Sequence, residues 1–75
     1  MLGFNRRAIA GAIMRHLARH PAAKDSARGV AAWCLMEIGI APPESLVEEV
    51  LEQLVREQRV GSSTLVDGTR IYHSR

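Results

Sequence analysis

Prolines divide this sequence into segments that can each be helical. Pro21 disfavours the helical conformation at the residue before it, and the pair Pro42 and Pro43 interrupts the chain a second time. The segments around these breaks repeat apolar side chains with the spacing of an amphipathic helix. We therefore expect three helices, over about residues 4–20, 26–38 and 45–58.

Signals at the ends of these segments support the prediction. Asp25 or Ser26 can cap the second helix by accepting a hydrogen bond from an unpaired backbone N–H, and Gly39 follows it where a left-handed residue is favoured. Ser45 and Glu48 have the spacing of a capping box for the third helix. The inward-facing apolar positions predict a shared core, which consists of Ile9, Ala10, Ile13, Met14, Leu17, Ala27, Val30, Ala31, Cys34, Leu35, Ile38, Val47, Val50, Leu51, Leu54 and Val55.

The last part of the chain predicts a β-hairpin. Asp67 and Gly68 form a two-residue turn signal between two β-prone runs. Such a turn sets the register, in which Val66 pairs with Thr69 and Thr64 pairs with Ile71 on the face toward the core. The opposite face then carries Leu65, Arg70 and Tyr72. The predicted fold is α+β, with one domain over residues 1–75 in which a three-helix bundle precedes a C-terminal hairpin.

Size and cysteine content limit the function classes. A domain of 75 residues buries only about 60% of the surface that its unfolded chain exposes, which leaves little material for a catalytic cleft. The one cysteine, Cys34, cannot form an intramolecular disulfide, and this fits a reducing compartment. The apolar stretch after Arg7 is cut off by Arg15, so we interpret it as part of a helix and not as a signal peptide. We expect a cytoplasmic protein without a membrane span.

The net charge of +2 hides an uneven distribution. Residues 1–30 hold six basic residues and one acidic residue, whereas residues 31–58 hold one basic residue and six acidic ones. Residues 59–75 hold three basic residues and one acidic residue. A basic first part and an acidic middle part allow two copies to dock head to tail. They also allow the domain to bind a charged protein partner.

The order of elements resembles that of the winged helix-turn-helix superfamily. The likeness is carried by the amphipathic run that starts at Ser45 and reaches Val60 through the spacing L-V-x-x-x-x-V, and by residues 67–72, which are similar to a wing tip and its returning strand. The resemblance implies that the third helix enters the major groove of DNA and that the wing touches the backbone or the minor groove. The positions that would then face DNA are Glu48, Glu49, Glu52, Gln53 and Arg56, with Arg70 in the wing.

The third helix departs from the DNA-binding pattern. Three glutamates and one arginine occupy its outer face, and Glu44 adds negative charge at its start. DNA carries about one negative charge per 1.7 Å of its axis, and cations supply much of the affinity for it. The glutamates also have a structural explanation, because acidic residues suit a helix start and Glu52 can pair with Arg56.

The leading hypothesis is a non-catalytic module that binds another protein or a second copy of itself. Trp33 and Met36 lie on the outer arc of a helix that is apolar on nearly all sides, where they either pack inside the fold or form a contact patch. The residues predicted to contact a protein partner are Trp33, Met36, Glu48, Glu49, Glu52 and Arg56. The alternative is a small DNA-binding regulator, whose contacts would come from Arg15, Arg19, Arg59, Arg70 and Arg75.

No catalytic, cofactor or metal site is predicted. His16 and His20 lie one helical turn apart, but two histidines alone do not make a metal site. Cys34 stands among apolar residues, which is typical of a small core residue. Because the sequence has no glycine-rich phosphate loop, paired-carboxylate cleft or serine-centred motif, we do not expect an enzyme, a cofactor or a small-molecule substrate.

Overall fold

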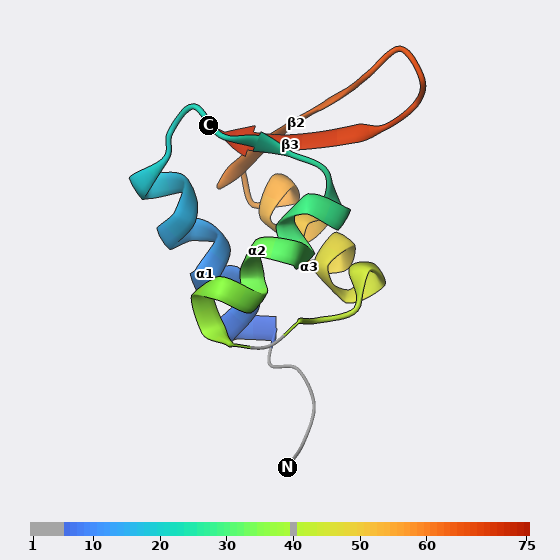
Figure 1. The fold of residues 1–75 in the computed structure, drawn as a ribbon. Helices are drawn as coiled ribbons and strands as arrows, with labels where there is room; N and C mark the ends of the chain where they lie inside the picture. Colours follow the sequence, from blue (N-terminus) through green and yellow to red (C-terminus); the bar gives the residue numbers. More distant parts are fainter. Residues whose placement is uncertain (1–5, 40) are drawn as a thin grey trace.

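The computed structural model describes residues 6–39 and 41–75. The helices pack against one another, and the hairpin projects away from them on the other side of the molecule (Figure 1). The elements in chain order are α1 (Arg6–Arg19), β1 (Lys24–Asp25), α2 (Ala27–Ile38), α3 (Glu44–Arg56), β2 (Val60–Thr64) and β3 (Arg70–Ser74). This confirms the predicted α+β fold of three helices followed by a hairpin wing. The predicted start of the first helix near residue 4 lies outside the described residues.

The short strand β1 was not predicted. Lys24 pairs with His73 and Asp25 pairs with Tyr72, both antiparallel, so that β3 lies between β1 and β2 in the sheet. Asp25 therefore belongs to the sheet, and Ser26 caps α2, with its Oγ accepting a hydrogen bond of 3.2 Å from the N–H of Gly29. A strand of two residues is too short to show a periodicity, so the sequence carried no signal for it.

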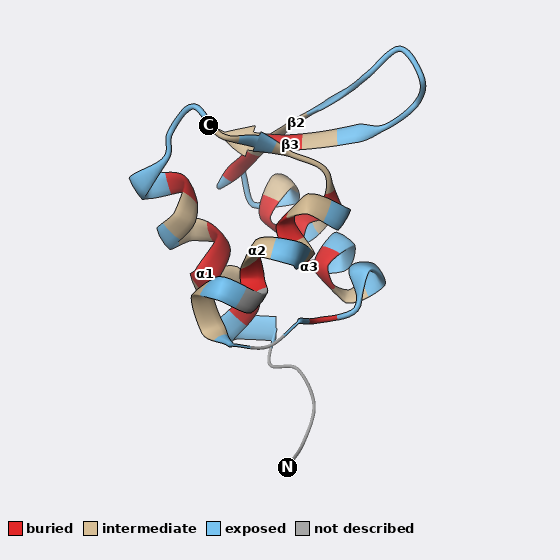
Figure 2. Cartoon of the chain, viewed as in Figure 1, coloured by how far each residue is buried: buried red, intermediate tan, exposed pale blue. Residues whose placement is uncertain are grey.

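The core lies between the facing sides of the helices and the sheet (Figure 2). Its buried members are Ile9, Ile13, Leu17, Ala27, Val30, Cys34, Val47, Val50, Leu51, Leu54, Val60 and Tyr72. Ala12 is also buried, although it was not predicted. The predicted members Ala10, Met14, Ala31 and Val55 pack partly buried against this core, and Ile38 is also partly buried. The side chain of Leu35 is outside the described part of the structure.

The ends of α2 and α3 differ in how well the sequence predicted them. Gly39 has a φ of 73° after α2, which confirms the left-handed end. The predicted capping box of α3 is wrong, because the helix begins at Glu44 and Pro43 is its N-cap without a side-chain hydrogen bond. Ser45 therefore already lies inside the first turn. After α3, the left-handed position is taken by Gln58, with a φ of 61°.

The turn of the hairpin is one residue longer than predicted. Thr64 pairs with Arg70, one residue away from its predicted partner. The N–H of Gly68 donates a hydrogen bond of 2.9 Å to the carbonyl of Leu65. The loop is thus formed by residues 66–68, with Gly68 at a φ of 92°, as in three-residue hairpin loops that end in a left-handed residue.

The longer turn reverses β3 relative to the predicted register, so that the opposite face of this strand lies toward the core. Tyr72 is buried in the core, although the predicted register placed it on the opposite face. Val66 is fully exposed at the tip instead of facing inward, and Leu65 beside it is 50% exposed. The wing therefore ends in two uncovered apolar side chains, next to the acidic Asp67.

Candidate interaction surfaces

Glu52 joins the outer face of α3 to the wing. Its carboxylate accepts hydrogen bonds from Nε of Arg70 at 2.5 Å, from Nη2 of Arg70 at 3.1 Å and from the hydroxyl of Tyr72 at 2.5 Å. We call these three residues the Glu52 cluster. Arg70 and Tyr72 are two residues apart on β3, so their side chains share the face that looks toward α3.

The Glu52 cluster shifts the ionisation of its own members. Hydrogen bonding to the Arg70 guanidinium lowers the pKa of Glu52 below its ordinary value. Burial, followed by the hydrogen bond to Glu52, raises the pKa of Tyr72 to about 12. Both shifts favour an ionised carboxylate beside a neutral phenol, which is the arrangement that these hydrogen bonds require.

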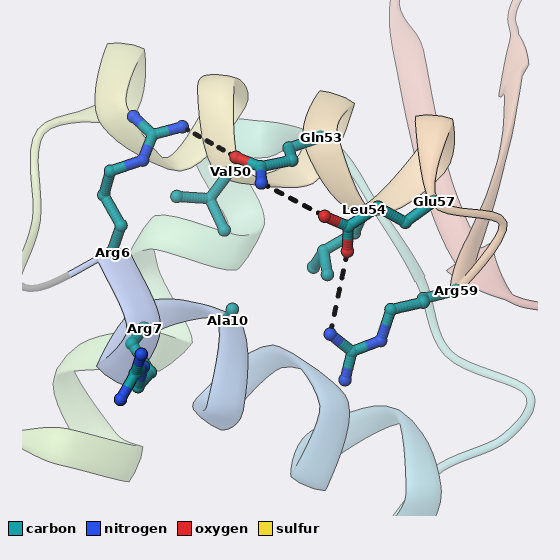
Figure 3. A pocket seen from close by; sticks show the side chains of 8 residues that line it. All are labelled: Arg6, Arg7, Ala10, Val50, Gln53, Leu54, Glu57 and Arg59. Carbon is teal, nitrogen blue, oxygen red and sulfur yellow. Dashed lines mark hydrogen bonds and ion pairs between the residues drawn. The ribbon is translucent and has the colours of Figure 1, made fainter.

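A second set of ion pairs joins α1 to α3. The guanidinium of Arg6 lies 2.9 Å from Oε1 of Glu49 and donates a further hydrogen bond of 3.2 Å to Gln53. Gln53 in turn donates to Glu57 at 3.1 Å, and Arg59 lies 3.8 Å from the same carboxylate. Figure 3 shows the chain of contacts that runs from Arg6 through Gln53 to Arg59.

These contacts surround a pocket of about 270 Å³ between α1 and α3. Arg6, Arg7 and Arg59 lie around it, with Glu57 between Gln53 and Arg59 (Figure 3). Its apolar wall is formed by Ala10, Val50 and Leu54. The volume is slightly below the roughly 300 Å³ at which small-molecule sites begin, and at least two of the surrounding arginines already bind groups of the chain itself.

The arginines predicted to contact DNA are largely engaged within the chain. Arg70 is bound to Glu52, Arg59 lies beside Glu57, and Arg19 forms an ion pair with Glu37. Arg15 and Arg75 are exposed. Each engaged guanidinium has a carboxylate next to it, and a phosphate group would have to compete with that carboxylate.

The structure separates Trp33 from Met36. The indole N–H of Trp33 donates to Oδ2 of Asp25 at 3.1 Å, and its ring stacks on that of His16 with centroids 3.8 Å apart. Trp33 also packs against the core. Met36, one turn further along α2, is 87% exposed. Of the two, Met36 is the one whose apolar side chain is open to solvent.

The predicted α3 positions also divide into two groups. Glu48, Glu49 and Arg56 are exposed, whereas Glu52 is partly buried in its cluster. Glu44 and Glu48 line a shallow pocket of about 310 Å³ together with Arg28 on α2 and Arg70 at the base of the wing. Sequence reasoning missed this junction of α2, α3 and the wing, because it depends on the register of the hairpin.

The histidines and the cysteine are placed as structural residues. The rings of His16 and His20 are 4.8 Å apart between centroids, and burial together with the nearby His20 lowers the pKa of His16. Cys34 is buried, and burial raises the pKa of its thiol. In the described ranges, no group of three or more histidine, cysteine, aspartate or glutamate side chains could hold a metal ion.

Two further findings concern membrane spans and similarity to known proteins. No helix within residues 6–39 and 41–75 has the length and apolar character needed to cross a membrane. No family model, no curated protein and no solved structure matches this chain.

Proposed function

We propose that this chain is a non-catalytic protein-interaction module with a winged-helix-like arrangement. The observation that carries the proposal is the Glu52 cluster, in which the wing arginine Arg70 is bound to the outer face of α3. A wing that contacts DNA directs its basic side chains to phosphate groups. Here the basic group neutralises a glutamate of the same chain, while Glu44 and Glu48 remain exposed beside it.

The proposed contact surface is the exposed acidic face of α3 and the adjoining base of the wing. Glu48, Glu49 and Arg56 lie on this face, and Arg28 and Arg70 border it. Alternating carboxylates and guanidinium groups suit a protein partner that presents both basic and acidic side chains, because complementary charges set the register of an interface. Glu52 supports this surface from within the fold, and Met36 on α2 is a second, apolar contact candidate.

A DNA-binding regulator is the alternative, and it has less support. It would need Arg19, Arg59 and Arg70 to leave the carboxylates that they now contact. Its affinity would then have to overcome the repulsion between phosphate groups and the exposed glutamates of α3.

Charge reversal on α3 tests the proposal. The wild type, the double variant Glu44→Lys/Glu48→Lys and the control Arg15→Glu, which reverses a charge on α1, are used as affinity baits in cells that express the protein. We expect a partner that the wild type and the control retain and the double variant loses. Its direct binding to the purified proteins is then measured by calorimetry, after circular dichroism has established that both variants fold. Identical partner sets for all three baits would contradict the proposal.

A further inference from the structure

The tip of the wing carries an apolar group beside a negative charge. Val66 is fully exposed and Leu65 is 50% exposed, and Asp67 follows them directly. The N–H of Thr69 donates a hydrogen bond of 2.9 Å to Oδ1 of Asp67 and holds the pKa of this carboxyl below its ordinary value, so that it is ionised. Because Val66 is fully exposed, it adds no burial to the fold of its own chain.

The pocket between α1 and α3, which we call the α1–α3 pocket, has the complementary chemistry. Arg6 and Arg59 lie at its opposite ends, with the apolar wall between them (Figure 3). Arg7 and Glu57 also line it, so that three arginines and one glutamate surround the pocket and make it basic. Its volume of about 270 Å³ suits one aliphatic side chain with a carboxylate next to it.

Arg59 can bind a further carboxylate. Its Nη1 lies 3.8 Å from Oε1 of Glu57, which is too long for a hydrogen bond. A guanidinium has five N–H donors and can hold a carboxylate through two of them. The Arg59 side chain is 52% exposed, so a second carboxylate can reach it without disturbing the core. Arg6, in contrast, is held by Glu49 and Gln53 and forms the far end of the pocket.

We propose that the wing tip of one copy of this chain enters the α1–α3 pocket of a second copy. Val66 then lies against the apolar wall of that pocket, and the carboxylate of Asp67 pairs with the guanidinium of Arg59 in the second copy. Most of the surface that leaves water belongs to Val66 and to the aliphatic parts of the surrounding arginines, because Val50 and Leu54 are already core residues.

The occupant of the pocket has to come from another molecule. Val66 follows Arg59 by seven positions along an extended strand, which places the tip roughly 20 Å from the base of the wing. The hairpin also projects away from the helices, so its tip cannot fold back into its own pocket (Figure 1).

Both charge and polarity favour a second copy as this occupant. The pocket combines an apolar wall with a basic border, and the tip combines an exposed aliphatic side chain with an ionised carboxylate. Because the tip and the pocket are different surfaces, the contact is heterologous, and each copy can offer its tip to one neighbour and its pocket to another.

The inferred association is weak. A loop tip in a pocket buries less than the roughly 1,200 Å² of a stable interface, so we expect a dissociation constant between about 0.1 mM and about 1 mM. The inference goes beyond the proposed function, because it adds a second contact surface that does not involve Glu44 or Glu48.

Replacing Val66 tests the apolar half of the contact, with average mass measured by light scattering between about 50 µM and about 1 mM protein. The mass of the wild type should rise over this range. Val66→Ser removes only exposed surface, so it should fold as the wild type does and associate about tenfold more weakly. The control Met36→Ser removes an exposed apolar side chain from α2 and should associate like the wild type. Equal association of Val66→Ser and wild type would overturn the proposal.

Exchanging charges tests the pair of Asp67 and Arg59. Asp67→Lys and Arg59→Glu each bring like charges together, so each variant alone should remain a monomer at about 1 mM. In an equimolar mixture, both contacts between unlike molecules again join opposite charges, and association should return. Circular dichroism establishes that each variant folds. If Asp67→Lys does not fold, Asp67→Asn, which keeps an acceptor for the N–H of Thr69, replaces it, and the mixture associates through the wild-type contact alone.

The outcomes distinguish this inference from the proposed function. A wild type that stays monomeric up to about 1 mM would overturn docking of the wing tip, and so would a mixture of the two charge variants that does not associate. Neither result decides whether the α3 face binds a partner, because the Glu44→Lys/Glu48→Lys baits test that separately.

Discussion

At the scale of single residues, Glu52 links the wing to the outer face of α3. It receives two hydrogen bonds from Arg70 and one from the hydroxyl of Tyr72. Hydrogen bonds to charged groups contribute more to stability than neutral ones, and those in partly buried positions contribute more than fully exposed ones. The cluster therefore joins the hairpin to the helical part of the molecule.

Replacing Glu52 by glutamine tests this role. Glu52→Gln keeps the size of the side chain and an acceptor for Tyr72 but removes the charge beside Arg70. We expect its free energy of unfolding to fall by about 1 kcal/mol in urea denaturation, and that of Tyr72→Phe to fall by a similar amount, about 1 kcal/mol. Because both changes act on one cluster, the double variant should lose less than the sum. Strict additivity would contradict a coupled cluster.

Because the pKa of Glu52 is lowered in the fold, the stability that the Glu52 cluster contributes should depend on pH. A carboxyl group whose pKa is lower in the folded state contributes stability fully above its unfolded value, here its ordinary value of 4.5. That contribution is lost as the pH falls through the folded pKa. The stability difference between the wild type and Glu52→Gln should therefore narrow in acid.

Tyr72 offers a spectroscopic measurement, because it is the only tyrosine in the chain. Its pKa is raised to about 12, first by burial and then by the bond to Glu52. Absorbance titration should give a midpoint of about 12 for the folded wild type and a lower one for Glu52→Gln. Because the neutral phenol is favoured in the fold, stability should decline as the pH rises above the ordinary value of 10. A midpoint near 10 in protein that is still folded would contradict burial of this ring.

At the scale of elements, the sequence predicted types and order better than ends and registers. Apolar periodicity and prolines located all three helices, because each buries one side in the same core. The Asp67 and Gly68 signal located the hairpin but not its register, since the pair fits both two-residue and three-residue loops. The predicted capping box is wrong because α3 begins one residue earlier, after Pro43, which leaves Ser45 inside the first turn.

The end of α3 contains a position where a substitution should stabilise the protein. Gln58 has a φ of 61°, a left-handed conformation that costs residues with a side chain about 1 kcal/mol. The N–H groups of Gln58 and Arg59 donate to carbonyls of the last turn, so this backbone geometry is required there. Gln58→Gly should raise the free energy of unfolding by about 0.5–1 kcal/mol, measured by urea denaturation.

The neighbouring residue provides the control for this substitution. Glu57 has a φ of −82°, which any residue adopts. Glu57→Gly gains nothing from glycine's freedom and should lower the stability. If both variants lose stability equally, the left-handed conformation at Gln58 does not carry the expected cost.

At the scale of the whole molecule, the sequence predicted where the charges lie along the chain but not how they pair. The acidic outer face of α3 follows from helical spacing alone. The pairing of Arg6 with Glu49 and of Arg70 with Glu52 joins residues 43 and 18 positions apart, and depends on the packing of α1 and on the hairpin register. Likewise, Trp33 and Met36 looked equivalent on a helical projection, but β1 supplies Asp25 to bind the indole of Trp33.

The measurement that tests the central claim most directly is a salt titration of binding to random duplex DNA. Fluorescence anisotropy would follow the labelled duplex from about 50 mM to about 200 mM salt, the range over which several phosphate contacts lose about 10³-fold or more in affinity. With Arg70 bound to Glu52 and an acidic α3, we predict no DNA binding at micromolar protein. Tight binding at low salt that falls steeply with added salt, and that Arg70→Ala abolishes, would contradict the account and favour a DNA-binding regulator.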